Sequence, residues 1–138
     1  MTYRKDWNQP QVGPEGFAGT MKAIGRTVTL AAADLVTGNT VGAFKVPAGF
    51  MVTGIIAIAS DMDSGAALTL SVGDATSGTR YLNASTIGQA GTTTQTLAST
   101  GLAFLNTVDT EILVTCTLQG SSSVAGTLGL WLTGFIAQ

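Results

Sequence analysis

The chain has 138 residues, a formal net charge of −2, no histidine, one cysteine and only 10% charged residues. This length suits one domain with one core. The lack of histidine excludes Ser-His-Asp and Cys-His catalysis and imidazole metal sites, and a single cysteine excludes an intramolecular disulfide framework or a cysteine-cluster zinc site.

The first segment, residues 1–25, is predicted to form an extended arm ahead of a β-domain over residues 26–138. It has neither a helical nor an alternating period, so it is not expected to form a packed element alone. Its isolated large apolar residues suggest that the arm docks on a sister subunit or on a larger surface. The alternative is a leader whose aromatic side chains touch nothing. The candidate protein-interaction residues are Tyr3, Arg4, Lys5, Trp7, Phe17 and Met21.

From residue 26 onward the pattern is typical of short strands separated by turn residues. The predicted strands cover residues 27–31, 41–46, 50–60, 67–73, 79–82, 111–118 and 127–136. Residues 87–99 are expected to form a long loop or a weak edge strand, and Gly54 a β-bulge. Helices over residues 34–38 or 95–105 remain alternatives. About eight strands of this kind predict an all-β sandwich or barrel, and threonine, the commonest residue, suits such strands.

Alternation along these strands predicts which side chains point into the core. The predicted inward side chains are Leu68, Leu70, Val72, Ile112, Val114, Cys116, Leu118, Leu128, Leu130 and Leu132. Trp131 and Phe135 fall on the opposite face of the last strand. They lie either beneath a second layer or exposed as an oligomer contact, and periodicity does not separate these two cases.

The side chains that could take part in catalysis or metal binding are each expected to have a structural role. Asp61-Met62-Asp63-Ser64-Gly65 resembles the start of a calcium loop but lacks the third Asp/Asn and the distal bidentate Glu, so a polar turn is expected. Asp74 and Arg80 flank a Gly/Ser/Thr turn that an ion pair between them would hold. Cys116 is expected to be a small buried hydrophobe. We therefore expect no catalytic residues, no metal site and no cofactor.

Nucleic acid, membranes and secretion are also not expected. Six scattered cations and a sequence pI near 4.7 do not form the basic stripe that phosphate binding requires. The best uncharged apolar window, residues 46–60, is too short to span a bilayer and contains Pro47, Gly49 and Gly54. The polar N-terminal segment has no secretory pattern, which predicts synthesis in a reducing cytoplasm.

Four stretches together resemble a known family. They are Phe44-Lys45-Val46-Pro47-Ala48-Gly49-Phe50, Asp61-Met62-Asp63-Ser64-Gly65, Leu68-Thr69-Leu70-Ser71-Val72-Gly73-Asp74 and Thr79-Arg80-Tyr81-Leu82-Asn83-Ala84-Ser85. Over residues 41–136 the chain is similar to small virion proteins of tailed bacteriophages, of the head decoration or capsid cement kind. The resemblance implies a jelly-roll-like β-sandwich, commonly a homotrimer. It also implies binding to the major capsid protein on the outside of the head, where it stabilises the expanded shell.

Two other functions remain open. A head-fibre, tail or baseplate component would contact the host surface and would favour exposed aromatic residues in loops, yet Trp131 lies in a predicted strand. A carbohydrate-binding β-sandwich would need a row of exposed aromatic side chains and usually a calcium site. The copy number in the virion and the oligomeric state in solution would distinguish these functions.

Overall fold

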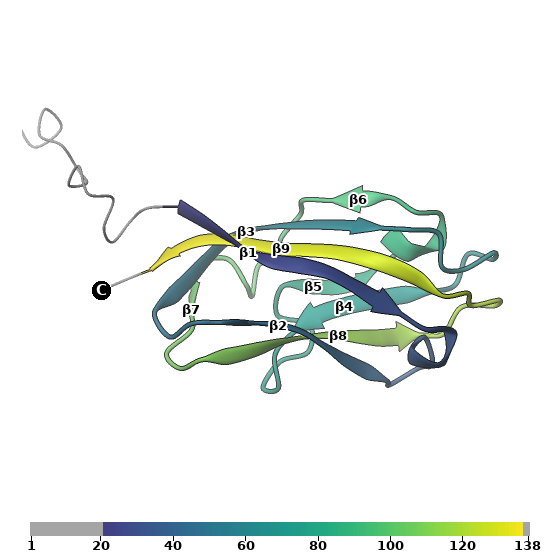
Figure 1. Cartoon of the computed structure of the whole chain (residues 1–138), viewed down its shortest axis with the longest axis horizontal. Coiled ribbons are helices and arrows are strands. Elements are labelled where there is room, and N and C mark those ends of the chain that lie inside the picture. The colour runs from purple at the N-terminus through teal and green to yellow at the C-terminus, as the bar shows by residue number, and fades with distance from the viewer. Residues whose placement is uncertain (1–20, 137–138) are drawn as a thin grey trace, which may run out of the picture.

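The computed structural model describes residues 21–136, which form two antiparallel β-sheets packed face to face (Figure 1). The five-stranded sheet has the order β1 (Met21–Leu30), β9 (Gly126–Ile136), β3 (Phe50–Ala59) and β6 (Thr93–Thr94), and β7 (Phe104–Leu105) also pairs with β3. The four-stranded sheet has the order β2 (Thr40–Val46), β8 (Thr110–Leu118), β4 (Thr69–Gly73) and β5 (Leu82–Ser85). Helical structure among these residues consists of two 3-10 turns, η2 (Ala32–Asp34) and η3 (Ile87–Gln89). The predicted all-β class is confirmed.

The connections make this sandwich a jelly roll. The chain crosses from one sheet to the other between β1 and β2, between β2 and β3, and between β3 and β4. The late strands β8 and β9 then insert between early ones, so that β9 pairs with both β1 and β3, and β8 with both β2 and β4. Strands from the two ends of the chain therefore hold each sheet together, as in a double-sheet jelly roll.

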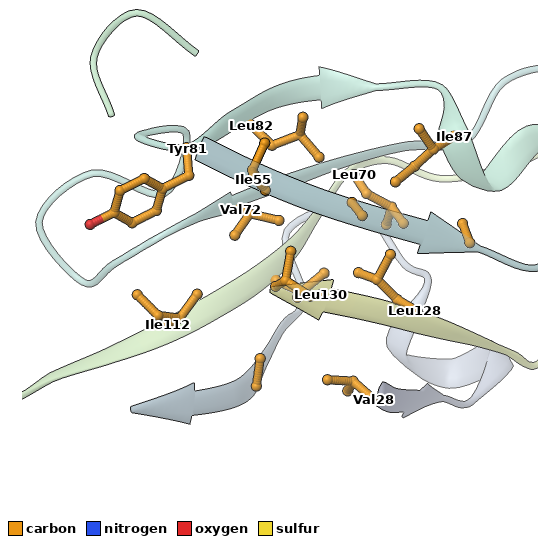
Figure 2. Close-up of a cluster of buried hydrophobic side chains, with 14 of the residues drawn as sticks. Val28, Ile55, Leu70, Val72, Tyr81, Leu82, Ile87, Ile112, Leu128 and Leu130 are labelled. Atoms are coloured by element: carbon orange, nitrogen blue, oxygen red, sulfur yellow. The ribbon is translucent and has the colours of Figure 1, made fainter. Parts of the chain in front are cut away.

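The core lies between the sheets and is built from alternate residues of their strands (Figure 2). The largest fully buried side chains are Tyr81, Phe50, Leu30, Leu35, Ile55, Met62, Leu68, Leu70, Ile112, Leu128, Leu130 and Leu132. The predicted inward rows are confirmed with one exception. Leu118 is 51% exposed because it is the last residue of β8, where the strand leaves the sandwich.

Pro47, Ala48 and Gly49 form the turn between β2 and β3. Phe50 donates its backbone N–H to the carbonyl of Pro47, at 3.2 Å, and Gly49 has a φ of +89°. A positive φ at this turn position favours glycine. The turn delivers the chain into β3, in which the predicted bulge is confirmed by a register shift between Val52 and Gly54.

Two strands differ from the prediction by more than two residues. β1 begins at Met21, six residues before the predicted strand, so residues 21–25 of the predicted arm pair with β9. The predicted strand over residues 79–82 lies instead at Leu82–Ser85. The preceding turn extends through Arg80, whose backbone N–H bonds to the carbonyl of Ser77.

The regions with open alternatives are also settled. Residues 34–38 contain only the end of η2 and residues 95–105 contain β7, so neither forms an α-helix. Residues 87–99 are mostly loop with η3 and the two-residue edge strand β6. Across the described part of the chain, no helix has the length and apolar character needed to cross a membrane.

Candidate interaction surface

Of the six candidate interaction residues, the structure describes one. Tyr3, Arg4, Lys5, Trp7 and Phe17 lie outside the described residues. Met21 is the first residue of β1, is 58% exposed, and lies opposite Phe135 of β9. The start of β1 and the end of β9 are therefore side by side at one end of the five-stranded sheet (Figure 1).

The outer face of this sheet carries large apolar residues among threonines and small residues. Its large apolar residues alternate with the buried ones along β1, β3 and β9, and we call them the apolar face: Met21, Met51, Ile56, Ile58, Trp131 and Phe135. The pairing puts Met51 opposite both Phe135 on β9 and Leu105 on β7. A row of large apolar side chains thus crosses four strands.

Trp131 occupies the middle of the apolar face, between Gly25 on β1 and Ile56 on β3. A Cβ atom on Gly129 would lie 2.7 Å from Cζ3 of the indole, so the ring lies over this glycine. Glycine next to the tryptophan on the same strand lets the ring rest close to the sheet. Trp131 and Phe135 are half-buried with no second layer over them among the described residues, which favours the oligomer-contact alternative.

The outer face of the four-stranded sheet has the opposite chemistry. Hydroxyl groups pair across its strands, with 3.1 Å between the Oγ1 atoms of Thr40 and Thr115 and 2.8 Å between those of Thr69 and Thr117. The buried hydroxyl of Ser71 accepts the backbone N–H of Ala84. These hydroxyl groups form hydrogen bonds within the protein and can also form them with water. The outer face of the four-stranded sheet is therefore more polar than the apolar face of the five-stranded sheet.

The loop that resembles a calcium site is organised by its own backbone. The carboxylate of Asp63, 1% exposed, accepts backbone N–H groups from Gly65, Ala67, Leu68 and Ser122, each at 3.0 Å. The Ala67 bond foremost, followed by that of Ser122, holds the pKa of Asp63 far below its usual 3.8. Among residues 21–136, no three acidic or cysteine side chains are grouped to hold a metal ion.

The predicted ion pair between Asp74 and Arg80 is confirmed. Arg80 Nε lies 2.6 Å from Asp74 Oδ2, and the backbone N–H groups of Thr76 and Ser77 bond to Oδ1 of the same carboxylate. Burial raises the pKa of Asp74, but the bonds from Arg80 and Ser77 outweigh it and leave that pKa below its ordinary value. The guanidinium also stacks 3.7 Å from the ring centroid of Phe104. The pair is thus a structural clamp on the turn.

An open groove of about 350 Å³ lies beside this clamp, along the segment from β7 to β8. Two of its three carboxylates have structural partners: Asp74 is held by Arg80, and Asp109 accepts the backbone N–H of Ala48 at 2.9 Å. Cys116 is buried as predicted, and burial raises the pKa of its thiol. A thiol in this state is a poor nucleophile.

Sequence analysis missed half of the apolar face. It identified Met21, Trp131 and Phe135 but not Met51, Ile56 or Ile58. The signal was present in residues 50–59, an apolar run with hardly any alternation. Such a run indicates a strand with apolar residues on both faces.

Comparisons with known proteins identify similar chains in phage capsids. A chain in the capsid asymmetric unit of cyanophage Pam1 is 29% identical, with a TM-score of 0.77, and the match covers 99% of each chain. A chain in the capsid of Ralstonia phage GP4 is 23% identical, with a TM-score of 0.77, covering 94% of this chain and 92% of that one. No protein-family model matches the sequence, and the search of curated proteins found no match.

A third similar chain shares the fold at low identity. It comes from the acid-stable capsid of the Helicobacter pylori bacteriophage KHP30, is 10% identical with a TM-score of 0.58, and the match covers 86% of this chain and 94% of that one. The GP4 and KHP30 matches establish likeness of fold. The Pam1 match adds sequence likeness over nearly the full length, with a capsid chain of about the same size.

Proposed function

We propose that this protein is a structural component of a bacteriophage capsid that decorates the outside of the head. There it binds the lattice of the major capsid protein as a homotrimer and stabilises the expanded shell. The similarity to the Pam1 capsid chain carries this proposal, because it spans 99% of both chains at 29% identity. The match therefore extends over nearly the whole length of both chains.

The chemistry of the described residues supports a role in contact rather than catalysis. The acidic side chains of Asp63 and Asp74 are engaged in fixing loops, and Cys116 is buried. With 10% charged residues, the surface gives little repulsion between copies and so favours association. Similarity to a capsid chain implies the same non-enzymatic role.

A decoration protein gains its strength from repetition. Each trimer on a lattice would present three bodies and three N-terminal arms, so weak individual contacts multiply through effective concentration. We propose Tyr3, Arg4, Lys5, Trp7 and Phe17 of this arm as contact residues, together with Met21 at the start of β1. Aromatic and arginine side chains are the residue types that most often dominate binding energy at interfaces.

Occupancy on purified heads tests the proposal. Heads assembled without this protein are mixed with the purified chain, and bound copies are counted by quantitative mass spectrometry and located by electron cryomicroscopy. We expect saturable binding to the outer surface, with a copy number that scales with the number of capsid subunits. We also expect decorated heads to release DNA at a higher temperature than bare heads. Presence in a handful of copies, or on the tail, would reject the decoration role.

A further inference from the structure

The apolar face lacks a cover among the described residues. Met21 is 58% exposed, Ile58 49% and the neighbouring Leu105 39%, and all three lie on the outer side of the five-stranded sheet. Large apolar side chains gathered on one exposed face of a folded protein mark an interaction site. The outer face of the other sheet differs, because threonine hydroxyl groups pair across its strands.

The twenty residues before Met21 have the chemistry to cover such a face. They carry three aromatic residues, Tyr3, Trp7 and Phe17, and their two basic and two acidic side chains cancel in charge. The apolar face contains no charged residue, which suits aromatic anchors.

The start of β1 is the point at which residues 1–20 join the fold. Met21 lies at one end of the sheet, and β1 runs from there toward the opposite end. To lie on its own apolar face, the chain would have to reverse in the residues next to Met21. Twenty residues span up to about 66 Å, roughly twice the length of a ten-residue strand. The segment is therefore long enough to reach and cross the sheet of a neighbour.

We infer that residues 1–20 of one copy bind across the apolar face of a second copy of this chain. Each copy gives its arm to one neighbour and receives an arm from another. Such a head-to-tail contact closes into a ring when the rotation between copies permits, and three copies form the homotrimer of the proposed function. The inference deepens that function, and its test uses the purified chain alone, with no capsid.

Two disruptive variants and one matched control test the arm exchange. The first variant lacks residues 1–20 and keeps every strand of the described fold. The second is Ile58→Asp, which places a charge on the apolar face. The control is Leu118→Asp, at a residue of similar exposure (51% against 49%) on the other sheet. The oligomeric state is measured by light scattering after size-exclusion chromatography, and circular dichroism verifies folding.

We expect the full chain and Leu118→Asp to be oligomers, and both disruptive variants to be monomers at the same concentration. Mixing the two monomers should then give a 1:1 complex, because one supplies an intact face and the other an intact arm. If the truncated chain does not fold, the full-length double variant Trp7→Ala/Phe17→Ala takes its place. A tenfold or greater loss of affinity is expected for it.

Three results would overturn the inference. A monomeric full chain would mean that the arm lies on its own face or on none. An oligomer that persists without residues 1–20 would mean that apolar faces bind each other directly. Monomeric variants that fail to complement each other would also contradict arm exchange. Failure to bind phage heads, in contrast, would reject the decoration role and leave the association result unchanged.

Discussion

At the scale of single residues, Asp63 shows how a charged side chain can hold two loops together. Its carboxylate is buried and joins two loops, accepting N–H groups from Gly65, Ala67 and Leu68 after β3 and from Ser122 before β9. Hydrogen bonds to a charged acceptor are stronger than those between neutral groups. Sequence analysis predicted the polar turn here but could not predict its bond to Ser122, because that residue is 59 positions away.

We predict that Asp63→Asn lowers stability clearly, with a thermal midpoint several degrees below that of the wild type. The amide turns an NH₂ group toward backbone donors and removes the charge, so several N–H groups lose a good acceptor. Differential scanning calorimetry measures the change. Asp61→Asn is the matched control in the same loop, because Asp61 accepts a single backbone N–H, from Asp63 at 3.2 Å. Equal midpoints for the two variants would show that Asp63 has no special role.

At the scale of elements, the alternation of apolar and polar residues predicts that a strand is present. Where the strand begins and ends depends on pairing with residues that are distant in the sequence. β8 and β9 lie within one residue of their predicted limits, because alternating apolar and polar residues cover their whole length. β1 starts earlier than predicted because its first residues, Met21 to Gly25, lack alternation and are held by pairing with β9. No local signal shows that pairing.

The displaced strand β5 has a similar cause. Asn83 was read as the end of a strand, but it lies inside β5. Ala84, with a φ of +47°, donates its N–H to the Ser71 hydroxyl, and the pairing with β4 shifts register there. The clamp between Asp74 and Arg80, which the sequence did predict, is what prolongs the turn before this strand.

We predict that Arg80→Lys destabilises the fold by about 1–2 kcal/mol, although the charge is kept. Lysine cannot reproduce the planar contact with both Asp74 and the Phe104 ring, and the Asp74 carboxylate is only 6% exposed. Urea denaturation at neutral pH gives the free energy of unfolding. Arg26→Lys, at an exposed residue of β1, serves as the comparison and should change it little. A loss of the same size in both variants would argue against the clamp.

At the scale of the whole molecule, the sandwich has two chemically different outsides. The outer side of the five-stranded sheet carries the apolar face, which includes Met21 at the start of β1. The outer side of the four-stranded sheet carries hydroxyl pairs such as Thr40 with Thr115. Composition and resemblance were enough to predict a jelly-roll-like virion protein. The distribution of apolar residues between the two outsides required the register of the strands, because Ile56 and Ile58 look like core residues in the sequence.

The whole molecule should lose stability in acid, because the two buried carboxylates within residues 21–136 are held in the charged form. The pKa values of Asp63 and Asp74 in the folded state both lie below the ordinary 3.8. The unfolded chain therefore binds more protons in acid than the folded chain does. The stability that these groups contribute is complete above about pH 5 and is lost as the pH falls below about 4 toward the folded-state pKa values.

We predict that the urea midpoint is nearly constant from pH 7 to pH 5 and declines below about pH 4. The decline should be shallower in Asp63→Asn, because that variant has already lost the charge whose protonation weakens the wild type. The two proteins should consequently differ most at neutral pH and converge in acid. Urea titrations monitored by tryptophan fluorescence at pH values between 7 and 2.5 measure this. A wild type and variant that decline in parallel would show that Asp63 does not contribute to the acid sensitivity.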